Sequence, residues 1–216
     1  TSANAEIKVV TSIKPIHSLA SYLMDGVDKP DLIVDGYASP HGFSMKPSHA
    51  KMLQNADLIF WVGEGVENFL EKPLNSIAKK AEKIELMETK GLQVLKFRER
   101  NIFDEHDHND HGKKEDDHDD HDHDDHGKKE EHDDHDEHDG HEGHAHGEYD
   151  AHIWLDPMNA KVILNEMAEH LIENDVENAS KYQDNLKKAL KEIDTLTIQV
   201  MTELNKSVSS IVFHDA

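Results

Sequence analysis

Histidine is the residue type that equips this sequence for chemistry. Thirteen of its nineteen histidines lie between Asp104 and Asp150, interleaved with aspartate and glutamate. Imidazole nitrogen is a good ligand for zinc, copper and nickel, and carboxylates add charge attraction and further ligands. The tract has too few apolar residues to form a core, and a purely solubilising loop does not need histidine at this frequency. The tract therefore predicts that the chain handles a transition metal, with zinc favoured.

The rest of the composition limits the kind of site and of partner. The tract carries −18 of the formal net charge of −23, so the acidity is local. It argues against a nucleic acid or an anionic membrane surface as partner. The chain has no cysteine, so a zinc site must be built from histidine and carboxylate ligands. No apolar run approaches the ~20 residues of a membrane span, so no direct membrane insertion is expected.

Apolar runs alternate with helical patterns through the first hundred residues. Short strands are predicted at 6–11, 31–34, 57–62 and 83–86. The intervening helices are predicted at 15–24, at 48–54 with Ser48 as its cap, and at 66–72. This alternation predicts an α/β fold with a parallel sheet covered by helices on both faces. Ligands bind beyond the carboxyl ends of such strands, and His41 follows the second strand, which places it on that rim.

Two helices are predicted after the tract. Asp156 followed by Pro157 is a strong helix start, and that helix is expected to end near Asn174. The second helix is predicted from about 178 to 206. Its apolar residues keep helical spacing without Gly or Pro, namely Tyr182, Leu186, Leu190, Ile193, Leu196, Val200 and Leu204. A rod of roughly 43 Å leading into a new strand indicates a rigid connector between two lobes.

Some aromatic and histidine residues outside the tract are expected to have no metal role. His17 lies in a predicted helix and is expected to be structural or solvent-facing, and His49 is expected at the surface. His170 sits among glutamates and is expected to be a solvated side chain. Trp61 and Trp154 are predicted to pack in the core.

Three segments resemble the metal-site motifs of a known family. They read SPHGFSMKPS at 39–48, HIWLDP at 152–157 and FHDA at 213–216. Together they resemble the cluster of ABC-transporter solute-binding proteins that carry zinc or manganese. The insertion rich in His and Asp before the second segment narrows the resemblance to periplasmic zinc receptors of the ZnuA type. LQNADL at 53–58 and WVG at 61–63 are also similar to that family.

The resemblance implies two α/β lobes joined by one long helix, with zinc in the cleft between them. It also implies that His41, His152 and His214 are the zinc ligands, two from the first lobe and one from the second. Three neutral imidazoles suit zinc and leave a fourth position for a carboxylate or water. Some family members place a glutamate before the first histidine, where this chain has Pro40. Because the ligands are rich in nitrogen, zinc is favoured over manganese.

This comparison divides the chain into five expected parts. Residues 1–5 would be a signal-peptide remnant, because Ala3-Asn4-Ala5 fits the small-residue pattern before a cleavage site. Residues 6–103 and 147–177 would form the first lobe, and 178–207 the connecting helix. Residues 208–216 would be the first strand of a second lobe, which makes this chain an expected N-terminal fragment.

The remaining part, 104–146, is predicted to be a disordered metal-binding loop that gathers or buffers zinc, or senses its excess. Its flexible sites should bind more weakly than a preorganised cleft, because binding must also order the loop. The weak auxiliary ligands are expected to be His118, His121, His123, His126, His132, His135, His138, His141, His144 and His146.

The expected function is that of a monomeric periplasmic carrier, not an enzyme. It would capture extracytoplasmic Zn²⁺ and deliver it to the membrane permease of an ABC-type importer. Three alternatives remain open: a zinc storage or chaperone protein that uses the tract as its main site, a manganese receptor, and a zinc hydrolase with a metal-bound water. The hydrolase is disfavoured because the sequence has no His-Glu-x-x-His motif.

Overall fold

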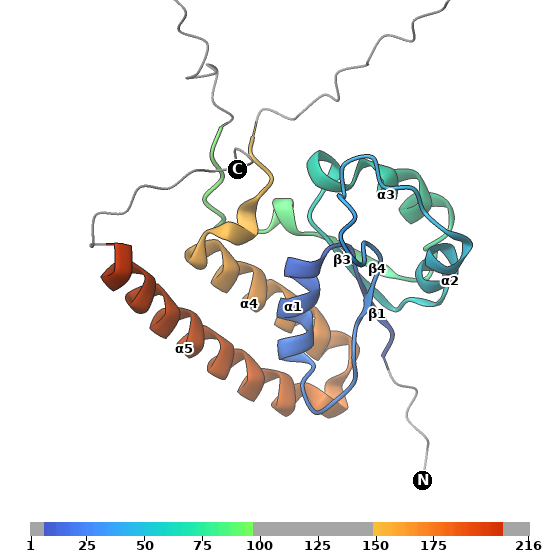
Figure 1. Cartoon of the computed structure of the whole chain (residues 1–216). Helices are drawn as coiled ribbons and strands as arrows, with labels where there is room; N and C mark the ends of the chain where they lie inside the picture. The colour runs from blue at the N-terminus through green and yellow to red at the C-terminus, as the bar shows by residue number, and fades with distance from the viewer. Residues whose placement is uncertain (1–6, 97–148, 205–216) are drawn as a thin grey trace, which may run out of the picture. The chain divides into compact units, whose positions relative to one another are not determined.

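The computed structural model of the chain describes residues 7–96 and 149–204, which belong to the same compact unit (Figure 1). The predicted leader 1–5, the loop 104–146 with its ten auxiliary histidines, and the terminal strand 208–216 lie outside the described residues. His214 lies outside them too. The predictions made for these segments therefore stay predictions.

A four-stranded parallel sheet forms the centre of the described unit. Its strands are β1 (Val9–Thr11), β2 (Asp31–Leu32), β3 (Leu58–Trp61) and β4 (Glu82–Glu85), in the order β2-β1-β3-β4. All three pairings are parallel, as predicted. Every residue of β3 is buried, as expected for a central strand covered on both faces. The first three strands are shorter than predicted, and β2 keeps only two of its four predicted residues. β4 has its predicted length but begins one residue earlier.

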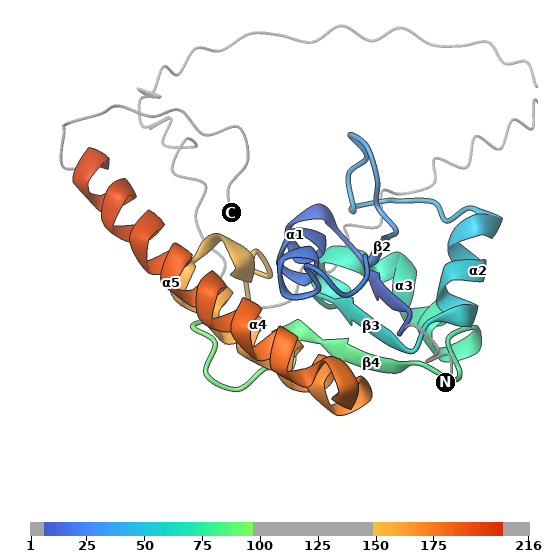
Figure 2. The same ribbon diagram turned by 90° about the horizontal axis from the view of Figure 1, so that it is seen from below.

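Five helices cover this sheet: α1 (Lys14–Leu23), α2 (Pro47–Asn55), α3 (Glu64–Ser76), α4 (Pro157–Asn174) and α5 (Ala179–Leu204). Figures 1 and 2 show α1, α4 and α5 on one side of the sheet, and α2 with α3 on the other. Short 3-10 turns complete the chain path at η1 (Leu86–Glu88), η2 (Ile153–Leu155) and η3 (Val176–Asn178). The predicted α/β class with flanking helices is confirmed. No helix within 7–96 or 149–204 is long and apolar enough to cross a membrane.

The prediction that Ser48 caps α2 was wrong. The helix begins one residue earlier, with Pro47 in its first turn and Lys46 as the capping residue. Proline is favoured at this position because its fixed φ suits the helix and it has no N–H to leave unpaired. The Lys46 amide donates instead to Nδ1 of His49 at 3.1 Å, so His49 closes the helix start.

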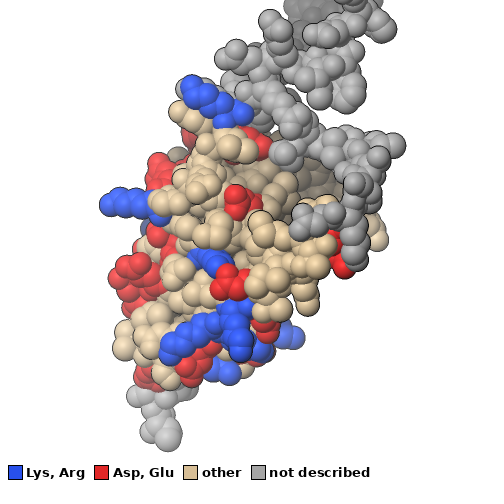
Figure 3. Space-filling view, turned by 90° about the vertical axis from the view of Figure 1, so that its left-hand side faces the viewer, with Lys and Arg blue, Asp and Glu red and all other residues tan. Residues whose placement is uncertain are grey.

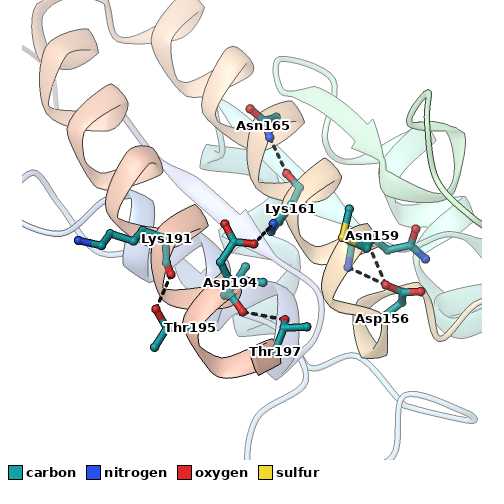
Figure 4. Close-up of polar contacts among 10 residues, drawn as sticks. Asp156, Asn159, Lys161, Asn165, Lys191, Asp194, Thr195 and Thr197 are labelled. Atoms are coloured by element: carbon teal, nitrogen blue, oxygen red, sulfur yellow. Dashed lines mark hydrogen bonds and ion pairs between the residues drawn. The ribbon is translucent and has the colours of Figure 1, made fainter. Parts of the chain in front are cut away.

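Helix α4 begins and ends where the sequence predicted. The Asp156 carboxylate accepts hydrogen bonds from the Met158 amide at 2.6 Å and the Asn159 amide at 3.4 Å (Figure 4). An ion pair between Lys161 and Asp194 links α4 to α5 (Figure 4). The Asp156 cap therefore fixes the start of α4. The ion pair between Lys161 and Asp194 stabilises the packing of α4 against α5.

The two halves of α5 have different surroundings. In the first half, Tyr182 and Ala189 are buried against α1 and α4, and Asn185 donates to the carbonyls of Leu23 at 2.7 Å and Asp25 at 2.9 Å. In the second half the apolar side chains are exposed, namely Leu196, Ile198, Val200, Met201 and Leu204. The predicted apolar stripe is thus covered only in its first half by the described residues. The connector role of this helix stays a prediction.

Candidate metal site

His41 lies at the carboxyl rim of the sheet, in the loop between β2 and α2. The His41 amide donates to Ser39 Oγ at 3.2 Å, and the Phe43 amide donates to the Pro40 carbonyl at 3.4 Å. These two bonds define a turn whose third residue is Gly42. Its φ of +76° is a backbone conformation that residues other than glycine rarely adopt. The His41 side chain is exposed. The loop therefore presents an accessible imidazole on a defined turn.

His152 reaches the same rim from the segment just before η2 and α4. Its amide donates to Asp150 Oδ1 at 2.9 Å, and its Nδ1 lies 2.7 Å from the same oxygen. Each of the two side chains is 18% exposed. Trp154 packs against the other side of the imidazole, with ring centroids 5.2 Å apart. The His152 imidazole is thus held in place by the Asp150 carboxylate and the Trp154 indole.

These two histidines come together in the folded chain. Their ring centroids lie 6.4 Å apart, with the planes inclined at 55°. Two imidazoles bound to one tetrahedral zinc, with Zn–N distances of about 2.0–2.1 Å, would have centroids roughly 5 Å apart. The observed separation is larger than this, so the two rings would have to move closer together to bind one ion.

The described residues supply two of the three predicted ligands. Within 7–96 and 149–204, no group of three or more His, Asp or Glu side chains is placed to hold a metal ion. His214 lies outside these ranges, so its place in the site stays a prediction. A pair of imidazoles is an incomplete set for zinc, which takes four ligands.

Two predictions about other histidines were wrong. His49 is only 8% exposed and stacks on Phe43 at a centroid distance of 5.5 Å. Burial, with the nearby Lys46 charge, lowers the pKa of His49. The His170 side chain is 21% exposed, and its Nδ1 lies 2.8 Å from Glu82 Oε1, so it pairs α4 with β4. Both side chains are drawn into tertiary contacts that sequence spacing does not reveal.

The predictions for His17, Trp61 and Trp154 agree with the structure. His17 is partly buried in α1, and burial lowers its pKa despite the nearby Asp31 and Asp35 carboxylates. Trp61 is buried in the core, and Trp154 is partly buried against it.

Sequence reasoning missed a buried carboxyl group beneath the rim. The Glu67 side chain contacts Ser12 Oγ at the end of β1 and accepts from the amides of Val62 at 3.3 Å and Gly63 at 3.0 Å. Burial raises the pKa of Glu67 to about 7, although these hydrogen bonds act in the opposite direction. The available signal was its helical spacing from Leu70 and Leu74, which places all three on the buried face of α3.

The exposed charge of the described unit is mixed in sign. Figure 3, which faces the side where α5 lies, shows lysines interspersed with acids and no broad basic area. Near the rim, burial raises the pKa of Glu85, and the neighbouring carboxylates of Glu88 and Glu64 raise it further. Glu85, Glu88 and Glu64 therefore form an acidic cluster at the end of β4 and the start of α3.

Solved structures of metal-binding proteins have the same fold. The Mn-bound periplasmic metal-binding protein of Candidatus Liberibacter asiaticus matches with a TM-score of 0.64 and 19% identity, over 93% of this chain and 58% of that chain. The Zn(II)-bound ZnuA-like domain of Streptococcus pneumoniae AdcA matches with a TM-score of 0.59 and 15% identity, over 89% and 53%. At these identities the likeness establishes a shared α/β fold.

Among proteins with this fold, the amino-acid sequence assigns the chain to one family. The family described as "ZnuA: Zinc-uptake complex component A periplasmic" matches residues 9–216. The chain therefore belongs to the ZnuA family, as its motifs predicted, and this family is a group of zinc-uptake components.

Curated relatives support the assignment along nearly the whole chain. The High-affinity zinc uptake system protein ZnuA of Brucella abortus (strain 2308) is 51% identical over 210 residues, which is 96% of this chain and 62% of that protein. The protein of the same name from Yersinia pestis is 33% identical over 98% of this chain and 61% of that protein. The chain thus spans about three fifths of the length of these relatives.

Proposed function

We propose that the protein is a periplasmic solute-binding protein that captures Zn²⁺ at His41, His152 and His214. The observation that carries this proposal is the His41–His152 pair, whose rings meet at the carboxyl rim of a parallel sheet. Membership of a zinc-uptake family supports zinc as the ligand. Neutral imidazoles favour zinc over manganese, which prefers carboxylates and water.

His214 is the proposed third ligand, contributed from outside the described residues. With three imidazoles the fourth position falls to a carboxylate or a water molecule. The separation of the two observed rings, which is greater than in a zinc-bound pair, fits a site that closes when further ligands and the ion bind. Zinc is cargo in this proposal, so the protein has no catalytic step to perform on it.

The loop 104–146 would act as a secondary binding region. Its histidines and carboxylates would gather or buffer zinc, or sense its excess, and each flexible site would bind more weakly than the cleft. Delivery would be to the membrane permease of an ABC-type importer, since the relatives are named as parts of a zinc uptake system. Residues 1–5 would be what remains of the export signal.

Calorimetric zinc titration of the complete natural protein tests the ligand set. We expect one tight site plus weaker sites, with His41→Ala, His152→Ala and His214→Ala each removing the tight site. Deleting 104–146 should lower the stoichiometry and leave the tight site in place. His170→Ala is the matched control, because His170 pairs with Glu82 away from the rim and should bind zinc like the wild type.

The same titration separates the proposal from a storage protein that uses the loop as its main site. Such a protein would keep its affinity in the three histidine variants and would lose it on deletion of the loop. That pattern would overturn the receptor assignment. The delivery step is tested separately, by asking whether zinc-loaded protein stimulates zinc uptake by the permease in vesicles.

A further inference from the structure

We propose that Asp150 is a positioning residue for zinc capture, which holds Nδ1 of His152 so that Nε2 is the nitrogen presented to the ion. The inference rests on the proposed zinc site. It adds Asp150, which would contact the zinc ligand His152 and not the zinc ion itself.

The first step is the geometry of the pair. One carboxylate oxygen, Asp150 Oδ1, lies 2.7 Å from the His152 ring nitrogen Nδ1 and 2.9 Å from the His152 backbone nitrogen. The two contacts fix both the backbone and the ring of the same residue. Because each side chain is only 18% exposed, solvent competes weakly for these bonds.

The second step is that Asp150 is itself anchored. Its amide donates to the Leu95 carbonyl at 2.8 Å, beside an antiparallel bridge between Lys96 and Tyr149. The next residue, Ala151, is 5% exposed and packs close to Gly65 at the start of α3. The backbone at Asp150 is therefore fixed by a hydrogen bond from its own amide and by the packing of the next residue.

The third step is chemical. A neutral imidazole has one N–H and one lone pair, and a carboxylate at Nδ1 stabilises the form with the proton on Nδ1. Metal ligation then falls to Nε2. Loss of a carboxylate that holds the other ring nitrogen of a ligating histidine commonly lowers metal affinity by about 10–100-fold.

Two variants of Asp150 and one matched control test this role in the complete protein. Asp150→Ala removes both contacts, whereas Asp150→Asn keeps an oxygen acceptor and loses the charge. The control is Asp156→Ala, which removes another Asp that bonds to backbone amides nearby but does not contact His152. The measurements are zinc affinity by competition with a chelator, and the His152 tautomer in metal-free protein by nitrogen-15 NMR at alkaline pH.

We expect the wild-type His152 ring to carry its proton on Nδ1, and Asp150→Ala to shift that proton towards Nε2. Zinc affinity should fall about 10–100-fold in Asp150→Ala and less in Asp150→Asn. It should be unchanged in Asp156→Ala. A purely structural role would leave the tautomer unchanged, or would make Asp156→Ala, which also loses stability, weaken zinc binding as much as Asp150→Ala does. Either result overturns the inference.

A comparison with His152→Ala separates this inference from the proposed function. If His152→Ala loses the tight site and Asp150→Ala does not, the inference is overturned and the zinc site stands. If neither variant changes zinc affinity, both are overturned.

Discussion

The imidazole of His41 lies in the loop after β2, and that of His152 precedes α4. Their ring centroids are 6.4 Å apart. The two segments are far apart in the sequence. The loop after β2 brings His41 to the carboxyl edge of the sheet, and the segment before η2 and α4 brings His152 beside it. His152 is held by Asp150 and Trp154, whereas His41 sits on an exposed turn. Zinc capture is therefore expected to move the His41 loop more than the segment around His152.

The turn that carries His41 makes a first prediction. Gly42 has φ of +76° and Gly36, in the same loop, has φ of +71°, and an added Cβ would meet nothing within 4 Å at either position. Replacement by alanine costs about 1–2 kcal/mol at such φ values. We expect Gly42→Ala to weaken zinc binding several-fold because it displaces the adjacent His41. Gly36→Ala, with the same backbone strain, should bind zinc normally in calorimetry, and equal losses in both variants would contradict a specific role for the turn.

Glu67 should make stability depend on pH. Its pKa is raised from 4.5 to about 7 in the folded protein, so the folded state holds the proton more tightly than the unfolded chain. This stabilisation is fully present below about pH 4.5 and is lost as the pH rises through about 7, a change of roughly 3 kcal/mol. Because glutamine mimics the protonated carboxyl, urea unfolding should give Glu67→Gln a stability close to that of the wild type near pH 4.5 and a higher stability than the wild type above pH 7.

Glu71→Gln is the control for that experiment, because Glu71 lies exposed on the same helix. Its unfolding free energy should follow the wild type at every pH. A wild-type curve parallel to that of Glu67→Gln would show that the Glu67 carboxyl does not titrate in this range.

Asn185 links α5 to the end of α1, and its loss should be costly. The side chain is 6% exposed and donates to the carbonyls of Leu23 and Asp25. Asn185→Ala leaves these two acceptors without their donor and should lower the free energy of unfolding by about 1–3 kcal/mol. Asn165→Ala removes an exposed amide that bonds within α4, and should change stability by less than about 0.5 kcal/mol. Chemical denaturation of both variants measures the difference.

The cap of α4 gives a prediction about stability alone. Asp156→Ala removes the acceptor of the Met158 and Asn159 amides and should cost about 1 kcal/mol. Asp156→Asn keeps a good capping group and should recover most of that loss in thermal unfolding. A loss as large in Asp156→Asn as in Asp156→Ala would argue against capping as the cause.

The sequence predicts best where the chemistry is local. The start of α4 follows from Asp156 and Pro157, because capping and the fixed φ of proline act within one turn. The parallel sheet follows from the alternation of short buried runs with helices. The α2 prediction failed at Ser48 because Pro47 competes for the same helix start.

Tertiary contacts explain what the sequence could not reveal. His49 stacks on Phe43 from the preceding loop, and Glu67 in α3 contacts Ser12, which follows β1. For the candidate site, the rim rule predicted the place of His41. The partnership with His152 rested on family resemblance, because the long acidic tract separates the two in sequence. Their proximity emerges only when the sheet and α4 are assembled.

The most direct test is a crystal structure of the complete protein with zinc, in which anomalous scattering locates the ion. We predict one strong peak bonded at about 2.0–2.1 Å to His41, to Nε2 of His152 and to His214. A zinc ion bound only by residues of 104–146, with no peak between His41 and His152, would contradict the account.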